Sequence, residues 1–253
     1  EEIMEEGVVI ALENDSLEQA DLIISPSNYL AKWLTSKNPS MKQKILVQRN
    51  CTLSKRITTT AQEPNTSNRY SNSEYPLVFF GRLEQRKGII LFVSALEKLK
   101  CPPKTVLFIG DDVKMCDGST ASDQVRQRLK KCDIEAQFID NYSRDQALNM
   151  LVNIKAVICI PSLIENSPCV IEELLDSGLR MVVTNVGGIP ELIPESQHKW
   201  LSTTESGELS KHLETALKCD NEIDYRLNSN IEGWKIALSW QGFHERLSKP
   251  SNN

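Results

Sequence analysis

The sequence lacks several patterns that identify common classes of protein. Its 253 residues contain no apolar run near the roughly 20 residues that a membrane-crossing helix needs. With a net charge of −5, the chain has no basic stripe dense enough for nucleic acid, so no nucleic-acid partner is expected. No GxxxxGKS/T is present, which excludes a P-loop NTPase. No GxGxxG follows a strand-like run, which removes the main support for a nicotinamide or flavin oxidoreductase.

The cysteines and histidines also lack a functional pattern. The seven cysteines are scattered, odd in number and without a CxxC pair, which is typical of thiols in a reducing cytoplasm rather than of disulfides or a zinc site. The three histidines show no metal-ligand spacing, and GDD (110–112) follows a strand-like run as a turn. No metal site is therefore predicted. The chain starts at Glu1 rather than Met, and we interpret it as a piece of a longer protein.

What the sequence does contain is an alternation of strand and helix patterns. The first part predicts a helix over 1–18, a strand over 20–27, a helix with Ser27 as its N-cap, and a strand over 44–50. Together the last three form a β-α-β unit. The segment that follows, 54–75, is polar and rich in Thr, Ser and Asn, and it predicts a linker or an exposed loop.

The part after this boundary is more regular. Five strand-like runs are each followed by a helix pattern: 77–81, 105–110, 136–140, 155–162 and 180–186. Because these runs are apolar almost throughout, they indicate strands buried on both faces of a parallel sheet. The expected fold class is α/β, with a Rossmann-like doubly wound parallel sheet. An amphipathic tail over 230–249 lies beyond the sheet and could pack back across a domain junction.

Three segments fall at the carboxyl ends of these strands, where open α/β sheets bind ligands. The first is GRLEQRKG (81–88). Arg82 offers a planar donor fork and Lys87 a point charge, and both suit a phosphate. Taken alone, surface cations beside a turn are the better interpretation, and Arg86 is assigned to that class.

The second segment is PSLIENSPCVIEELLDSG (161–178), which carries two spaced carboxylates. Glu165 is expected in the loop and Glu173 about one turn into the next helix, whose start favours an anion. Two carboxylates beside a phosphate make sense only if they accept hydrogen bonds from hydroxyl groups, those of a sugar on one side and a ribose on the other. As isolated acids they would be cap and solvent-facing charges, and Glu172 is assigned to that class.

The third segment is TNVGGIPELI (184–193), in which Gly187 and Gly188 permit a tight turn or a close backbone approach. Pro190 and Glu191 suit the first turn of a helix. A strand–helix turn accounts for most of this segment by itself.

In this order and spacing, the three segments resemble the retaining glycosyltransferases of family 4 (glycosyl transferases group 1), whose GT-B fold has two Rossmann-like domains facing across a cleft. The resemblance runs from about residue 20 to 247 and includes ADLIISPS, KILVQRN and SWQGFHERL. It implies that most of the acceptor domain is missing and that the chain has four parts: 1–53, the last β-α-β segment of the N-terminal acceptor domain; 54–75, a linker; 76–229, the donor nucleotide-sugar-binding domain; and 230–253, a C-terminal crossover helix and tail.

The resemblance also implies roles for individual residues. Arg82 and Lys87 would grip the donor diphosphate and stabilise the leaving nucleoside diphosphate. Glu165 would hold hydroxyls of the transferred sugar, which makes these three the implied catalytic residues. Glu173 would take the ribose hydroxyls. The other implied donor contacts are Gly81 in the first loop, Asn166, Ser167 and Pro168 at the sugar, the amides of Cys169 and Val170 at the phosphate, and Asp140, Asn141 and Tyr142 around the base.

The chain departs from the family pattern at a few of these positions. Members often have Gly after the first glutamate and again near position 168, where this chain has Asn166 and Pro168. Because Pro168 has no N–H, its backbone cannot donate a hydrogen bond to the sugar. Tyr142 could stack on the base, and an exposed turn aromatic is the equal alternative. After the crossover strand, many members read Asn-Gly where this chain has Asn50-Cys51.

The implied function is that of the donor-binding part of a retaining glycosyltransferase. It would move a hexose from a nucleotide-diphosphate sugar, with UDP-glucose as the best choice, to a saccharide or lipid-linked acceptor in polysaccharide biosynthesis. The expected location is the cytoplasm or the cytoplasmic face of the membrane, with peripheral contact through the missing domain. Neither a cofactor nor a metal is expected, and the chain alone is expected to be inactive without the full acceptor domain.

Two alternatives belong to other classes. A non-catalytic nucleotide-sugar-binding or regulatory module would keep the site without turnover, and the intact Arg82, Lys87, Glu165 and Glu173 argue only against decay of the site. A nucleotide-sugar epimerase would need a TyrxxxLys pair and a glycine-rich first loop, and the sequence has neither.

Overall fold

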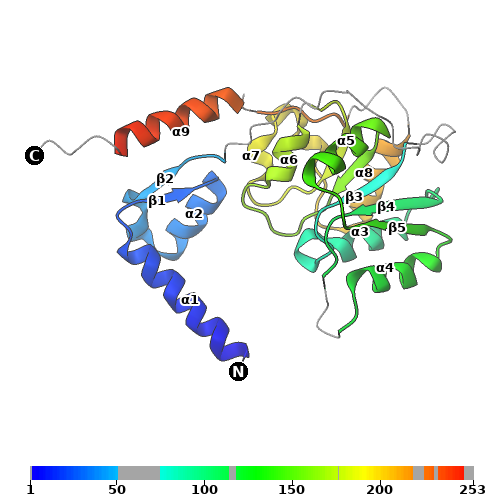
Figure 1. The fold of residues 1–253 in the computed structure, drawn as a ribbon, viewed down its shortest axis with the longest axis horizontal. Coiled ribbons are helices and arrows are strands. Elements are labelled where there is room, and N and C mark those ends of the chain that lie inside the picture. The colour runs from blue at the N-terminus through cyan, green and yellow to red at the C-terminus, as the bar shows by residue number, and fades with distance from the viewer. Residues whose placement is uncertain are drawn as a thin grey trace, which may run out of the picture. The chain divides into compact units, whose positions relative to one another are not determined.

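A computed structural model of the chain divides into two compact units, Glu1–Cys51 with Glu232–Asn253, and Thr52–Ile231 (Figure 1). The structure describes residues 2–50, 75–113, 118–175, 177–218, 225–230 and 233–247. The expected linker over 54–75 lies outside the described residues except for Tyr75. Among the described helices, none combines the length and the apolar composition that crossing a membrane requires.

The larger unit is built on a sheet of five parallel strands in the order β5-β4-β3-β6-β7. The strands are β3 (Leu77–Phe80), β4 (Thr105–Ile109), β5 (Glu135–Ile139), β6 (Val157–Ile160) and β7 (Arg180–Val183). Its helices are η2 (Gln85–Lys87), α3 (Ile89–Leu96), α4 (Ala121–Lys130), α5 (Arg144–Asn153), α6 (Cys169–Leu174), α7 (Ile189–Leu192), η3 (Glu195–Trp200) and α8 (Ser206–Leu217). The five expected strands all form, and the α/β class is confirmed.

Helices cover both faces of this sheet (Figure 1). Because successive side chains on a strand point to opposite faces, each strand contributes to two separate cores. In β3, Leu77 and Phe79 pack with residues of α3, α4 and α8, whereas Val78 and Phe80 pack with residues of α5, α6 and α7. This three-layer arrangement explains why the strands are apolar throughout, and it confirms the doubly wound sheet.

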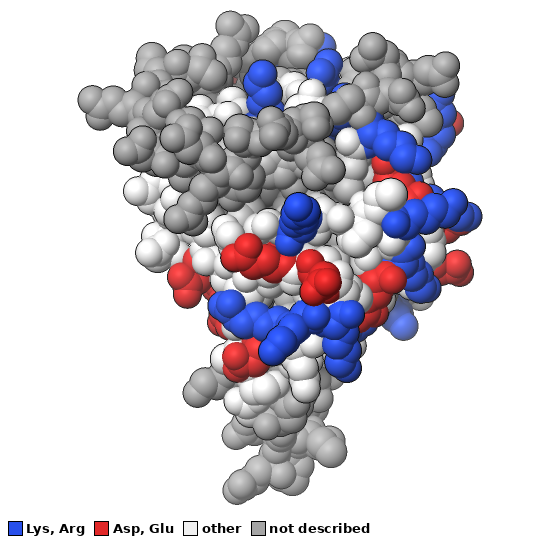
Figure 2. Space-filling model, turned by 90° about the vertical axis from the view of Figure 1, so that its right-hand side faces the viewer, with Lys and Arg blue, Asp and Glu red and all other residues white. Residues whose placement is uncertain are grey.

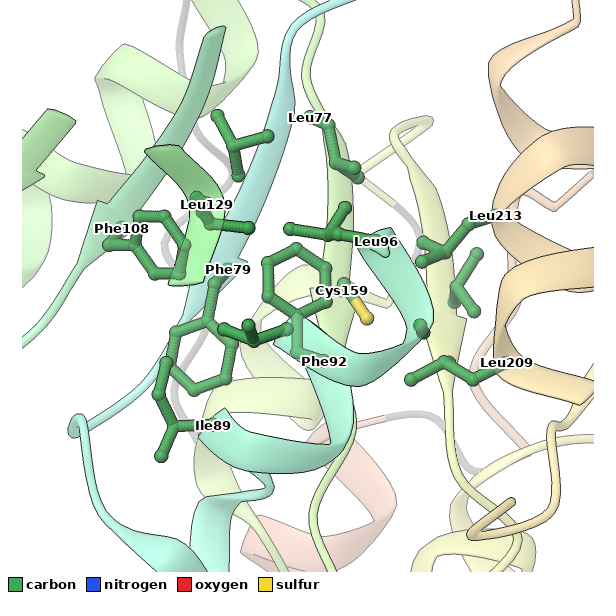
Figure 3. Close-up of a cluster of buried hydrophobic side chains, with 14 of the residues drawn as sticks. Leu77, Phe79, Ile89, Phe92, Leu96, Phe108, Leu129, Cys159, Leu209 and Leu213 are labelled. Atoms are coloured by element: carbon green, nitrogen blue, oxygen red, sulfur yellow. The ribbon is translucent and has the colours of Figure 1, made fainter. Parts of the chain in front are cut away.

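Three phenylalanines of the first core, Phe79, Phe92 and Phe108, lie against one another among leucine side chains (Figure 3). The rings of Phe79 and Phe92 lie 5.5 Å apart, and Phe92 meets Phe108 edge-on at 5.8 Å, both within the range of favourable aromatic pairs. Cys159 lies in the same cluster, and burial raises the pKa of its thiol well above the usual value. This cysteine is therefore a packing residue and not a nucleophile.

The smaller unit contains the β-α-β segment expected from the sequence. Its elements are α1 (Glu2–Gln19), β1 (Ile23–Ser25), α2 (Asn28–Lys37), η1 (Pro39–Gln43), β2 (Ile45–Val47) and α9 (Gly233–Leu247). β1 and β2 pair in parallel. The Ser27 side chain accepts a hydrogen bond from the Leu30 N–H, which confirms the predicted N-cap of α2.

The C-terminal helix α9 belongs to this smaller unit, although almost 200 residues of chain separate it from β2. Ser239 Oγ donates to the side-chain oxygen of Gln48 at 2.8 Å, and Trp240 Nε1 donates to the Arg49 carbonyl at 2.7 Å. Phe243 is buried. The amphipathic tail thus packs on the segment that follows β2.

Candidate functional site

The loops after β3 and β6 meet because these two strands are neighbours in the sheet. The Leu163 N–H in the second loop donates to the Arg86 carbonyl in the first at 2.9 Å. Gly88 ends the first loop with φ +78°, and a Cβ there would lie 1.8 Å from the Pro161 carbonyl oxygen. The last residue of GRLEQRKG must therefore be glycine for the two loops to approach so closely.

Lys87 and Glu165 contact each other across this junction. Lys87 Nζ donates to Glu165 Oε1, and the side chains are 20% and 7% exposed. Arg86 Nη1 lies 4.0 Å from the same oxygen. A carboxylate as buried as Glu165 is costly without such partners, so the two cations stabilise it at this position.

Glu165 also accepts a hydrogen bond from a buried hydroxyl group, which a second buried residue supports. Ser162 Oγ donates to Glu165 Oε1 at 3.0 Å, and Thr184 Oγ1 donates to the Ser162 carbonyl at 2.5 Å. Ser162 and Thr184 are both fully buried. Thr184 follows β7, so the loops after three neighbouring strands converge on one carboxylate.

The glycine pair of the third segment fixes the backbone of Glu165. The Gly188 N–H donates to the Glu165 carbonyl at 3.2 Å. Gly187 has φ +58°, and a Cβ there would lie 1.7 Å from that same oxygen. The close backbone approach that the sequence predicted for this pair is therefore directed at Glu165.

Arg82 is more open than Lys87. Its side chain is 53% exposed, and Nη2 lies 3.2 Å from Glu84 Oε1, an oxygen that Arg86 also contacts at 2.8 Å. Arg82, Arg86 and Lys87 together with Glu84 and Glu165 make three cations against two carboxylates. The cluster carries one surplus positive charge, which suits an anion.

Charges of both signs lie close together on one face of the molecule (Figure 2). On the face in Figure 2, Lys and Arg side chains lie interspersed with Asp and Glu side chains. Charge on that face is therefore compensated locally.

Glu173 has a different partner, which sequence reasoning missed. It is 9% exposed on α6, and Arg144 Nε lies 2.7 Å from its Oε1. Arg144 is the first residue of α5, and its side chain is 51% exposed. The available signal was its place directly after the segment expected to meet the base, but no sequence pattern links two residues on separate helices.

The remaining expected site residues lie in the segments that follow the carboxyl ends of β3, β5 and β6. Asp140, Asn141 and Tyr142 are exposed in the turn between β5 and α5, and Tyr142 is 40% exposed. Pro168 is buried at the N-cap of α6 without a side-chain capping bond. Ser167 Oγ donates to Glu172 Oε1 at 3.0 Å. Asn166 and Cys169 are exposed, and Val170 is half-buried. Gly81 has φ +147° directly after β3.

The acidic GDD turn after β4 has an internal use. Asp112 Oδ1 accepts a hydrogen bond from the Ser122 N–H at 3.2 Å, which ties the turn to the start of α4. Within the described ranges, no three His, Cys, Asp or Glu residues gather in a way that could hold a metal ion.

Comparison with known proteins gives relatives for both sequence and fold. The phosphatidylinositol N-acetylglucosaminyltransferase gpi3 subunit of Schizosaccharomyces pombe is 25% identical over 177 residues, 68% of this chain and 37% of that protein. The sulfoquinovosyl transferase SQD2 of Arabidopsis thaliana is 28% identical over 183 residues, 70% of this chain and 33% of that protein. The chain thus spans about a third of the length of these relatives.

The fold is similar to that of Anabaena HepE, solved in complex with UDP and glucose, with a TM-score of 0.68 and 20% identity. The match covers 90% of this chain and 63% of that one. A sucrose-phosphate synthase from Thermosynechococcus elongatus matches with a TM-score of 0.62 and 17% identity over 94% of this chain and 61% of that one. The family model for glycosyl transferases group 1 matches residues 62–234. The chain therefore belongs to the glycosyl transferases group 1 family and contains its donor-binding domain of GT-B type.

Proposed function

We propose that this chain is the donor-binding part of a retaining hexosyltransferase that uses a nucleotide-diphosphate sugar, with UDP-glucose as the donor. The acceptor would be a saccharide or a lipid-linked acceptor in polysaccharide biosynthesis. Because the chain spans about a third of its curated relatives, we further propose that residues 1–53 complete an acceptor domain, that 54–75 link it to the donor domain over 76–229, and that 230–253 cross back to it.

The observation that carries this proposal is the paired Lys87 and Glu165, held at the junction of the loops after β3 and β6. A cation and a carboxylate in contact form a site in which each group is ready for a different part of one ligand. The cation suits a phosphate, and the carboxylate suits sugar hydroxyls. The surplus positive charge around them favours an anionic ligand.

Donor binding would then proceed by exchange of partners. Lys87 turns from Glu165 to the diphosphate, and Glu165 accepts hydrogen bonds from hydroxyls of the hexose instead. Ser162 keeps the carboxylate in place during the exchange, since it donates to the same oxygen at 3.0 Å. The half-exposed Arg82 leaves Glu84 for the diphosphate.

In the reaction, the bond between the anomeric carbon and the diphosphate oxygen breaks, and negative charge develops on the departing nucleoside diphosphate. An acceptor hydroxyl oxygen bonds to the anomeric carbon, and its proton passes to the departing diphosphate. Arg82 and Lys87 would stabilise this charge, which is electrostatic catalysis by groups already in position. These two residues and Glu165 form the proposed catalytic set. Neither a cofactor nor a metal takes part in the proposed reaction.

The nucleoside side of the donor would lie over α6. Glu173 accepts hydrogen bonds from the ribose hydroxyls, and the amides of Cys169 and Val170 meet the phosphate. Asp140, Asn141 and Tyr142 enclose the base. The sugar lies toward Gly81, Asn166, Ser167 and Pro168. The choice of UDP-glucose is supported by HepE, which has been solved with UDP-glucose and shares this fold.

Calorimetric titration of the chain with UDP, GDP, ADP and UDP-glucose in the presence of EDTA tests the proposal. We expect saturable binding of UDP and tighter binding of UDP-glucose. A preference for GDP or ADP would correct the donor. Absence of binding to all four ligands would overturn the proposal for this chain.

A further inference from the structure

The contact between Arg144 and Glu173 joins two parts of the donor domain that the strand order keeps apart. Arg144 begins α5, which follows β5 at one edge of the sheet, whereas Glu173 lies on α6, which follows β6 on the other side of β3 and β4. Arg144 Nε nevertheless lies 2.7 Å from Glu173 Oε1, and the two side chains form an ion pair. The loop after β5 is thus tied to the proposed ribose carboxylate.

The start of α5 is itself fixed, so this tie has a defined geometry. Ser143 caps the helix in a capping box: the Gln146 N–H donates to Ser143 Oγ, and the Ser143 N–H donates to the Gln146 side-chain oxygen at 2.8 Å. Arg144 Nη1 also lies 3.4 Å from Asp145 Oδ1. The guanidinium therefore extends from a rigid helix start.

Glu173 needs the partner that Arg144 supplies. Its side chain is 10% exposed, and a buried carboxylate without a cation or hydrogen bonds destabilises the fold. A carboxylate group has two oxygens and about four acceptor positions when ionised, so the Arg144 ion pair at Oε1 leaves capacity for a diol. The Arg144 side chain is half-exposed, so water can solvate its charge without a protein partner. Glu173 is buried and lacks this alternative, so the contact matters more for Glu173 than for Arg144.

We propose that Arg144 is a positioning residue that orients the Glu173 carboxylate to accept hydrogen bonds from a ribose 2′,3′-diol. The inference rests on the proposed function, because it takes Glu173 as the ribose-binding residue. It adds a prediction that the proposed function does not make. Discrimination between a ribonucleotide and its 2′-deoxy analogue depends on a residue that need not touch the nucleotide.

The test is calorimetric titration of the full 253-residue chain with UDP and 2′-deoxy-UDP, or with the corresponding pair for whichever base the first titration prefers. In Arg144→Gln, we expect affinity for UDP to fall about tenfold and affinity for 2′-deoxy-UDP to fall less than about threefold, because the oriented carboxylate matters only where there is a diol to bind. Glu173→Gln should likewise reduce the ratio of the affinity for UDP to the affinity for 2′-deoxy-UDP. Arg144→Lys keeps the charge and should retain part of the discrimination.

Arg126→Gln is the matched control, since this arginine on α4 lies over the Phe138 ring at 4.3 Å and should leave both affinities unchanged. Thermal melts of each variant show whether the fold is intact. A purely structural Arg144 would weaken both ligands equally, and that result overturns the inference. Tighter UDP binding in Arg144→Gln also overturns it, because Arg144 would then compete with ribose for Glu173.

The outcomes separate this inference from the proposed function. A wild-type chain that binds no nucleoside diphosphate refutes the proposed function and the inference with it. A wild-type chain that binds UDP and 2′-deoxy-UDP equally refutes the inference and the ribose role of Glu173, while donor binding itself stands. An Arg144→Gln variant that discriminates as well as wild type refutes the inference alone.

Discussion

Lys87 and Arg82 occupy different environments although the sequence places them in one short loop. Lys87 is largely buried and paired with Glu165, whereas Arg82 is 53% exposed beside Glu84. The sequence identified both as phosphate-binding candidates, because their type and position at a strand end are visible in it. It could not reveal their separate partners, since those depend on how close each loop approaches its neighbours.

These environments predict different effects for two substitutions that both remove a cation. Arg82→Ala and Lys87→Ala should each weaken UDP binding by roughly 1.5–3 kcal/mol, measured by calorimetry. Lys87→Ala should also lower the free energy of unfolding by about 1–3 kcal/mol, because it leaves the buried Glu165 carboxylate without its cation. Arg82→Ala should leave the stability almost unchanged.

A double variant separates the two effects of Lys87. Lys87→Met combined with Glu165→Gln removes both charges, so most of the lost stability should return while UDP binding stays weak. Urea denaturation and calorimetry on the same samples check this. Unchanged UDP affinity in both single variants, with the fold intact, would exclude the loop as a diphosphate site.

The two glutamates predict a second contrast. Glu173→Ala should weaken the binding of UDP itself, by about 1–3 kcal/mol, because UDP contains the ribose. Glu165→Ala should not weaken UDP but should abolish the extra affinity of UDP-glucose over UDP, because its proposed partner is the hexose. Titrations of UDP and UDP-glucose against both variants provide the four affinities. Equal losses of UDP affinity in the two variants would contradict the assignment of Glu173 to the ribose and Glu165 to the hexose.

At the level of elements, three loops after β3, β6 and β7 are locked together by close backbone contacts. Gly187 is the tightest, with φ +58° and room for no Cβ against the Glu165 carbonyl. The sequence predicted a tight turn or a close backbone approach at Gly187 and Gly188, because glycine permits both. It did not anticipate α8, although Leu209, Leu213 and Ala216 repeat at helical spacing and are buried there.

Gly187→Ala should therefore destabilise the fold by at least about 1–2 kcal/mol, because the left-handed backbone conformation is costly for alanine and the added methyl group would displace Glu165. Urea denaturation measures this loss. Gly207→Ala is the control, because Gly207 lies in the first turn of α8 with open space around it and no positive φ. That substitution should be neutral or stabilising by up to about 1 kcal/mol. Similar behaviour of the two variants would contradict the argument.

For the molecule as a whole, the α/β class could be predicted from the sequence. Each strand of the larger sheet is buried on both faces and therefore consists mostly of apolar residues. The two cores on either side of the sheet contain the residues that this pattern predicted. Pairings such as Arg144 with Glu173 could not be predicted, because they join helices after non-adjacent strands. They depend on side-chain reach across the finished sheet, which no local pattern encodes.

Global stability should depend on pH through His212 on α8. Its Nδ1 lies 2.9 Å from the Tyr225 hydroxyl, and burial lowers the pKa of the imidazole below its usual value. Nearby Glu208 raises this pKa and Lys211 lowers it. The folded state therefore prefers neutral histidine. The stabilising contribution is complete above the unfolded pKa of about 6.5 and is lost as pH falls through the folded value.

Urea denaturation at a series of pH values, from about 7.5 down to 5, should show this loss in the wild type. His212→Asn, which keeps a polar group near Tyr225 but does not titrate, should lose less stability over the same range. Parallel pH profiles for the two proteins would show that His212 makes no contribution.

The contact between Lys87 and Glu165 joins residues 78 positions apart in the chain, across the pairing of β3 with β6. During synthesis, a nascent chain that ends after β5 already contains the cation of the site but not yet its carboxylate. The proposed donor site therefore cannot be complete before β6 and the loop after it have been made. A ligand that needs both groups would bind only the folded domain. Its binding would shift the folding equilibrium toward the native state, and more so at higher ligand concentration.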